Sequence, residues 1–371
     1  MPEISIHTSL RPSPYYESAL ADGATTLHPY NRMMIPLGYG DPDEEYRRLV
    51  EGVSMWDVGA ERQVQLKGPD AATLAQILCT RDLSKAVVGQ GKYVALCDHR
   101  GTIINDPIAL KIADDCFWLS IADSDIGLWA RCLAAERGLD VDVSEPDVSP
   151  LAVQGPMAED VVASMFGDWV RDLKYFWFGD AEIDGIPLKI ARSGWSKQGG
   201  FELYLMDGAR GGDLWNLVKE AGQPWDIGPG YPNGSERIES GLLSWAGDCD
   251  DQTNPFEVRL ARFVDLDVPD DVIGIQALRR IKAEGPKRHQ LGIVLDDQRR
   301  PGHERWFDVT ANGDRVGDMT TGAWSYKLER NIGFGLLSTD CQIGDEVVVH
   351  LKHGPVTGHL TDIPFTKDAV A

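Results

Sequence analysis

An acidic residue at position 106 interrupts an apolar stretch, where a carboxylate is suited to chemistry with a charged partner. Asp106 lies in TIINDPIAL, residues 102–110. A carboxylate with such neighbours is expected to be partly desolvated, and desolvation strengthens its interaction with any cation or proton-bearing group. The alternative is a turn formed by Asn105, Asp106 and Pro107, with the carboxylate in solvent. The sequence leaves both interpretations open.

A second carboxylate lies in the alternating stretch GGFELYL, residues 199–205. If Phe201, Leu203 and Leu205 face one side of a strand, Glu202 and Tyr204 share the other side. A carboxylate and a phenol on one face suit the recognition of a polar heterocycle. An exposed strand face is the alternative interpretation.

Aromatic residues are dense in or beside the irregular segments of the chain. Aromatic rings attract a ligand cation, so such residues suit a pocket for an onium group. The alternative is that each of them is an ordinary core residue. The set is Tyr30, Tyr175, Phe176, Trp177, Phe178, Trp195, Tyr204 and Trp245.

Several common catalytic signatures are missing from the sequence. It contains no G-x-x-x-x-G-K-[ST], no G-x-S-x-G and no H-E-x-x-H motif, so nucleotide-enzyme and hydrolase functions lack support. The six cysteines include no C-x-x-C pair. They are expected to be buried in a reducing compartment, with no metal site.

The charge balance narrows the class of partner. The chain carries 36 basic and 58 acidic residues, a net charge of −22. Such a field repels phosphate backbones and anionic membranes, so neither nucleic acid nor a membrane is an expected partner. Residues 1–14 show no basic segment followed by an apolar one, and no apolar run approaches about 18 residues. We expect a cytoplasmic protein.

The helices and strands that would position these residues do not alternate regularly along the chain. Helical periods are expected over residues 43–55, 69–83, 124–137, 158–166, 212–221 and 235–246. Strands are expected over residues 62–68, 93–98, 102–112, 116–122, 181–193 and 201–205. Since few helices separate the strands, this order predicts an α+β fold with antiparallel sheets. Beyond about residue 285, strands are expected over 289–296, 305–311, 332–338 and 346–352, which predicts a small β-barrel or sandwich.

Five segments resemble, in this order, the signature segments of the tetrahydrofolate-dependent aminomethyltransferase family, whose founding member is the glycine cleavage T-protein. They are TIINDPIAL, LAVQGP, ARSGWSKQGGFELYL, ERIESGLLSW and TTGAWSYKLERNIGFG. The resemblance covers nearly the whole chain. It implies two interleaved α+β subdomains that form a folate site, residues 1–285, and a C-terminal β-barrel domain, residues 286–371. GWSKQGG and NPFE are most similar to the dimethylsulfoniopropionate demethylase branch.

The resemblance also implies roles for individual residues. Asp106 matches the catalytic aspartate beside N5 of tetrahydrofolate, and Glu202 matches the carboxylate that reads the pterin ring. Gln154 and Arg237 match positions near the folate. Trp195 and Tyr204 match positions that hold the sulfonium substrate, and Tyr30 and Trp177 are further aromatic candidates for substrate binding. Lys197 and Arg32 are the alternative candidates for pairing with the substrate's carboxylate.

The implied activity is methyl transfer from a sulfonium donor, dimethylsulfoniopropionate, to N5 of tetrahydrofolate, giving 5-methyltetrahydrofolate and a thioether. A first alternative keeps the folate chemistry with an N-methyl donor of the betaine type or an O-methyl aromatic donor. An oxygen leaving group needs a proton donor, for which His28 is the candidate. A second alternative is a non-catalytic folate-binding protein. The expected partner is a small-molecule methyl donor, and a homodimer is a further expectation.

Overall fold

The computed structural model describes residues 9–366, which form two compact units interleaved along the chain. The first unit holds the residues up to Leu74, Ala86–Lys92 and Ile108–Asn233, and the second holds Ala75–Lys85, Tyr93–Pro107 and the residues from Gly234 on. This division differs from the expected boundary between residues 285 and 286, which stays a prediction. Part of the N-terminal stretch inspected for a signal peptide, residues 1–8, lies outside the described residues. No helix within residues 9–366 has the length and apolar character needed to cross a membrane.

The first unit contains two large, mainly antiparallel sheets and five helices among its described residues. The helices are α1 (Tyr16–Ala21), α2 (Pro42–Glu51), α4 (Ile126–Arg137), α5 (Ala158–Phe166) and α6 (Gly211–Ala221). A six-stranded sheet has the order β13 (Phe178–Ile183), β14 (Ile186–Ala191), β15 (Gly200–Leu205), β12 (Ser149–Gln154), β4 (Ser54–Asp57) and β16 (Gly228–Gly230). Within it, β4 and β16 pair in parallel. A five-stranded sheet has the order β11 (Asp142–Ser144), β5 (Gln63–Lys67), β10 (Cys116–Ser120), β9 (Ile108–Ala113) and β6 (Gly91–Tyr93). A smaller sheet joins β1 (Arg11–Pro12), β3 (Met33–Gly38) and β2 (Thr26–Tyr30).

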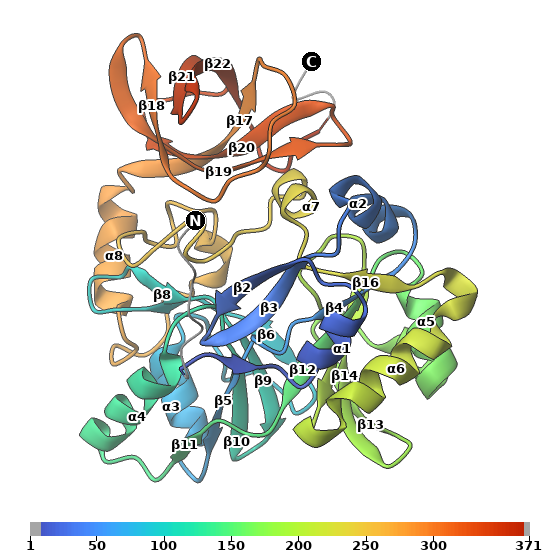
Figure 1. The fold of residues 1–371 in the computed structure, drawn as a ribbon. Coiled ribbons are helices and arrows are strands. Elements are labelled where there is room, and N and C mark those ends of the chain that lie inside the picture. Colours follow the sequence, from blue (N-terminus) through green and yellow to red (C-terminus); the bar gives the residue numbers. More distant parts are fainter. Residues whose placement is uncertain (1–8, 367–371) are drawn as a thin grey trace. The chain divides into compact units, whose positions relative to one another are not determined.

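Local signals explain where several of these elements begin and turn. Helix α2 begins after Asp41, whose side chain accepts from the Asp43 N–H, and Pro42 occupies the first helical turn. Strands β13 and β14 join through Asp184 and Gly185, whose φ values of 50° and 72° match a tight hairpin turn. Helices α5 and α6 pack together and cover one face of the six-stranded sheet (Figure 1).

The two faces of β15 have different environments, as the alternation of residues 201–205 predicts. Phe201, Leu203 and Leu205 belong to the apolar core that includes side chains of α5 and α6. Tyr204 belongs to a separate cluster with side chains of β9 and β10. Because residues alternate across a strand, Glu202 shares the face of Tyr204.

The second unit carries the closed barrel. Its six strands follow the order β17 (Arg288–Leu295), β20 (Arg330–Ser338), β19 (Asp314–Ser325), β18 (Phe307–Ala311), β21 (Glu346–Leu351) and β22 (Gly354–Thr361). Its other elements are the short hairpin of β7 (Leu96–Cys97) and β8 (Ile103–Asn105), and the helices α7 (Gly234–Glu239) and α8 (Ile275–Glu284), while α3 (Ala71–Leu78) begins in the first unit and ends in the second. The α+β class with a C-terminal barrel is therefore confirmed. Among these elements of the second unit, the sequence patterns missed α8, β19 and β22.

Two expected elements have other bounds. The helix expected over residues 235–246 ends at Glu239, because Gly241 adopts a φ of 73° and the Leu242 N–H bonds back to the Arg237 carbonyl at 2.8 Å. This is the helix-terminating pattern that a left-handed glycine permits. The strand expected over residues 102–112 is two strands, β8 and β9, separated by Asp106 and Pro107. Proline has no N–H to donate to a ladder, so the strand breaks at Pro107, beside Asp106.

Candidate active site

Glu202 lies buried at the centre of the six-stranded sheet. It pairs in register with Ala191 of β14 and Ala152 of β12, so small side chains flank it on both neighbouring strands. The Ser193 hydroxyl donates to Glu202 Oε2 at 2.6 Å, and the Tyr204 hydroxyl donates to the same oxygen at 2.9 Å. Glu202 is only 6% exposed, so the alternative of an exposed strand face is wrong.

The environment of Glu202 leaves acceptor capacity for a ligand. Burial raises its pKa, and the hydrogen bonds from Ser193 and Tyr204 act in the opposite direction by favouring the carboxylate. Among residues 9–366, none donates a hydrogen bond to Oε1. Oε1 does not belong to the buried side-chain atoms that lack a partner, so it keeps contact with solvent and can accept a hydrogen bond from a ligand. A reduced pterin carries N–H donors, so this carboxylate fits it chemically.

Gln154 holds the loop that leads into β15. Its amide nitrogen donates to the Ser193 carbonyl at 3.0 Å, and its amide oxygen accepts from the Ser196 hydroxyl at 2.8 Å. Gln154 is 1% exposed and lies between Gly194 and Gly200, where any added Cβ would overlap its amide group. The predicted contact of Gln154 with the cofactor stays a prediction, while its role in shaping the loop is visible.

The glycine at position 194 is expected to be essential for this loop. Gly194→Ala places a Cβ on the Gln154 amide at a φ of 145°, so we expect a loss of about 3 kcal/mol in the free energy of unfolding from overlap and backbone strain. Gly199→Ala is the matched control, because Gly199 also has a positive φ, 83°, but no atom within 4 Å of the added Cβ. It should lose only about 1 kcal/mol. Urea unfolding measures both, and equal losses would contradict the role of Gln154.

The predicted substrate-binding residues do not form one cluster. Tyr204 belongs to the Glu202 group, and Trp195 and Lys197 lie on the loop that Gln154 holds, the first half-buried and the second exposed. Tyr30 packs against another apolar cluster, and the Trp177 ring is covered by the Lys174 ammonium at 5.8 Å. Their contacts with a substrate stay predictions.

Asp106 lies in the second unit, immediately after β8. The Tyr93 hydroxyl donates to its Oδ2 at 2.7 Å, and the Tyr93 ring packs edge-on against Phe263 with the ring centroids 4.8 Å apart. Desolvation raises the pKa of Asp106 to about 7; the Tyr93 hydrogen bond lowers it, and the charge of Asp248 raises it further. The carboxyl is therefore half-buried, hydrogen-bonded and close to half-ionised at neutral pH. The interpretation as a solvated turn is wrong.

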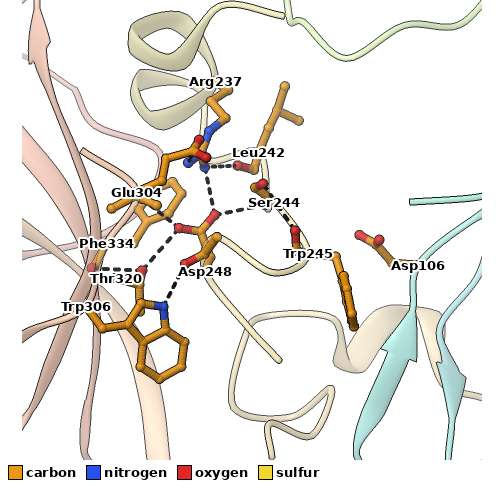
Figure 2. A network of polar contacts seen from close by, with 12 residues as sticks. Asp106, Arg237, Leu242, Ser244, Trp245, Asp248, Glu304, Trp306, Thr320 and Phe334 are labelled. Atoms are coloured by element: carbon orange, nitrogen blue, oxygen red, sulfur yellow. Dashed lines mark hydrogen bonds and ion pairs between the residues drawn. The ribbon is translucent and has the colours of Figure 1, made fainter. Parts of the chain in front are cut away.

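Arg237 lies deep in the second unit, on α7. Its side chain is fully buried, and its guanidinium donates to the Asp248 carboxylate at 2.7 Å and to the Leu242 carbonyl at 3.3 Å (Figure 2). It also pairs with Glu304 at 3.2 Å. A contact between Arg237 and the cofactor stays a prediction, because these interactions are all within the protein.

Sequence patterns missed three polar partners of these residues. Tyr93 is the last residue of β6 and Ser193 lies two residues after the end of β14, and neither residue type is unusual there. Asp248 follows a Trp-Ala-Gly turn and resembles any surface aspartate in the sequence, yet it is 0% exposed. These residues become partners only because folding brings distant segments of the chain together, so no local sequence signal identifies them.

The fold gives the class of protein first. It is an α+β chain with a terminal β-barrel, and it carries Asp106, whose pKa is raised to about 7, in its second unit and the buried Glu202 in its first. Residues 15–268 match the GCVT N-terminal domain, and residues 288–367 match the glycine cleavage T-protein C-terminal barrel domain. The chain belongs to this family.

Individual relatives agree with this assignment. The chain is 39% identical over 328 residues to the dimethylsulfoniopropionate demethylase DmdA of Ruegeria pomeroyi, covering 88% of this chain and 89% of the relative. It is 30% identical over 374 residues to an aminomethyltransferase of Symbiobacterium thermophilum, covering 97% and 98%. The crystal structure of aminomethyltransferase T from Bartonella henselae shares the fold, with a TM-score of 0.83, 22% identity and coverage of 97% and 99%.

Family membership settles the general activity. The chain is an enzyme, a methyl or aminomethyl transferase that uses tetrahydrofolate as co-substrate. The alternative of a non-catalytic folate-binding protein is therefore wrong.

Proposed function

We propose that this enzyme moves a methyl group from dimethylsulfoniopropionate to N5 of tetrahydrofolate, giving 5-methyltetrahydrofolate and a thioether. The observation that carries the proposal is the 39% identity with a dimethylsulfoniopropionate demethylase, compared with 30% for the aminomethyltransferase of Symbiobacterium thermophilum. The half-buried Trp195, on the loop before Glu202, supports it, since an aromatic ring attracts a sulfonium.

This methyl transfer needs no acid catalyst to protonate the leaving group. Bound tetrahydrofolate supplies the nucleophilic nitrogen, and the sulfur–methyl bond breaks with its electron pair left on sulfur, so the leaving group is a neutral thioether. The protein has to align the reacting atoms and exclude water. Glu202 would orient the pterin through its free Oε1.

Asp106 would act as the base for the proton on N5. As the new carbon–nitrogen bond forms, N5 loses its hydrogen, and the Asp106 carboxylate is the acceptor for that proton. A base works best when its pKa lies near the working pH, and the pKa of Asp106 is about 7. Before the proton moves, the negative carboxylate stabilises the positive charge that develops on N5.

The pH dependence of the rate should follow the ionisation of the Asp106 carboxyl. Since the carboxylate is the active form, kcat/KM should rise with pH and level off above about 7. Tyr93→Phe removes the hydroxyl that favours the carboxylate, so the pKa of Asp106 should increase and the midpoint should move up by about one pH unit. The measurement is the pH profile of both proteins. A midpoint that moves down in Tyr93→Phe would contradict this role.

A donor panel tests the proposed substrate. Purified protein with tetrahydrofolate is given dimethylsulfoniopropionate, a betaine, a methoxy aromatic compound or aminomethyl donors, and folate products are separated by chromatography. We expect 5-methyltetrahydrofolate from the sulfonium only. Turnover with a betaine or a methoxy aromatic would replace the donor while keeping the folate chemistry, and His28, which is exposed on β2, would then be the proton donor to test for the methoxy compound. Formation of methylenetetrahydrofolate from an aminomethyl donor would instead overturn the proposal.

A further inference from the structure

A buried carboxylate in the second unit accepts four hydrogen bonds. Asp248 Oδ2 accepts from Arg237 at 2.7 Å and from the Ser244 N–H at 2.8 Å. Asp248 Oδ1 accepts from the hydroxyls of Thr320 at 3.1 Å and Thr321 at 2.6 Å, both on β19. The side chains of Arg237 and Asp248 are 0% exposed. The loop of residues 242–249 is therefore tied to α7 and to the barrel at one point (Figure 2).

The same loop carries Trp245 to the strand that precedes Asp106. The Trp245 indole N–H donates to the Ile103 carbonyl of β8 at 3.4 Å. The backbone of Trp245 also forms an isolated β-bridge with Cys249. Trp245 and Ile103 also share one apolar cluster. Figure 2 shows the Trp245 ring on the side of the loop that faces Asp106. An ordered loop thus packs an aromatic ring against the segment that ends in the reactive carboxyl.

Stability alone explains this network poorly. Two buried charges lose their hydration, and well-packed apolar residues of similar volume are often no less stable. The charge of Asp248 also acts on Asp106, because it is one of the causes that raise the pKa of Asp106. Arg237 is the cation that offsets this charge. The pair therefore has both a mechanical and an electrostatic connection to the reaction.

We propose that Arg237 and Asp248 are positioning residues for Asp106: they hold the loop of residues 242–249 so that Trp245 packs beside β8, and they balance the charge that Asp106 experiences. This role replaces a direct contact of Arg237 with folate. It deepens the proposed function, on which it rests, because it concerns the group that accepts the proton from N5.

Neutralising Asp248 and neutralising Arg237 should shift the pKa of Asp106 in opposite directions. Asp248→Asn removes a buried negative charge while the positive charge of Arg237 stays, so the ionisation midpoint of Asp106 should fall by about one pH unit or more. Arg237→Gln leaves Asp248 unbalanced, so the midpoint should rise. The other groups near Asp106 are unchanged in both variants; they are Tyr93, Cys249 and, beside Tyr93, Arg262. A purely structural role predicts loss of folded protein with no such opposite shifts.

Tryptophan fluorescence of the ligand-free protein is a readout that needs no turnover. The pH titration of the intact chain should contain a transition near 7 that is missing in Asp106→Asn, because ionisation of that carboxyl changes the emission of Trp245. Trp245→Phe should remove the same transition and retain the fold. If the transition persists in Trp245→Phe, the proposed coupling between Trp245 and the ionisation of Asp106 is refuted.

Controls and a milder variant complete the test. Asp318→Asn and Arg315→Gln break an ion pair of 2.6 Å on the same strand, β19, and should leave the midpoint unchanged. Thr321→Val keeps both buried charges and removes one donor to Asp248, so it should raise the midpoint by a few tenths of a pH unit even if the charge variants fail to fold. No shift in folded Thr321→Val, or shifts of the same sign in the two charge variants, would overturn the proposal. Because the titration contains no donor or folate, a wrong donor assignment would leave it intact.

Discussion

Asp106→Asn is expected to lower the rate of methyl transfer by about 10²- to 10⁴-fold, the usual contribution of a positioned general base. The amide cannot accept the proton that leaves N5, and it carries no charge to stabilise the developing cation. The Tyr93 hydroxyl can still donate to the amide oxygen, so the local packing should persist. Single-turnover measurements of 5-methyltetrahydrofolate formation at pH 8 give the rate, and an unchanged rate would remove Asp106 from the mechanism.

The same variant has a predictable effect on stability. The pKa of Asp106 in the folded protein, about 7, is above its unfolded value, so its contribution to stability is present at low pH and is lost as the pH rises through about 7. Asp106→Asn should therefore be at least as stable as the parent protein at pH 8, and this advantage should vanish near pH 4. Thermal unfolding at the two pH values measures it.

Asp98 provides the matched control on the same hairpin. Its carboxylate accepts from the Arg100 side chain at 2.7 Å and from the Thr102 hydroxyl at 2.9 Å. Burial acts to raise the pKa of Asp98, but these hydrogen bonds outweigh it and hold the pKa below its usual value. Its contribution to stability is present above the unfolded pKa and is lost as the pH falls. Asp98→Asn should thus lower stability at neutral pH without lowering the chemical rate, the reverse of Asp106→Asn.

Glu202→Gln is expected to weaken tetrahydrofolate binding by about 10- to 100-fold, the equivalent of one charge-assisted hydrogen bond. The glutamine oxygen can accept from Ser193 and Tyr204, which turns its NH₂ group toward the position of Oε1. Donor would then meet donor wherever a pterin N–H is aligned with that position. Calorimetry with tetrahydrofolate measures the affinity, in the absence of any methyl donor.

A carboxylate elsewhere in the same sheet separates this effect from a general loss of charge. Glu182 is exposed on β13, so Glu182→Gln should leave the affinity for tetrahydrofolate unchanged. If Glu202→Gln binds as tightly as the parent protein, Glu202 does not read the pterin ring. Since burial raises the pKa of Glu202, its replacement should also cause no loss of stability at alkaline pH.

The two candidate carboxyls are readable in the sequence, but the network around them is not. Asp106 and Glu202 stand out because each is a carboxylate inside an apolar or alternating stretch, and in the structure each is desolvated. Gln154 stands out only through the resemblance, and its amide fills the space between two glycines. Asp248 has no signal at all, since four donors from three separate segments converge on it.

Local patterns in the sequence were enough for the α+β class, the terminal barrel, many of the helices and strands, and the choice of Asp106 and Glu202 as candidates. They were enough because periodicity, turn residues and desolvating neighbours act over a few positions along the chain. Only the tertiary structure identifies the hydrogen-bond partners of the buried carboxyl groups. Tyr93 meets Asp106 across 13 residues, and Thr321 meets Asp248 across 73. Hydrogen bonds and charge–charge interactions depend on distance in space, and a sequence without its fold does not contain those distances.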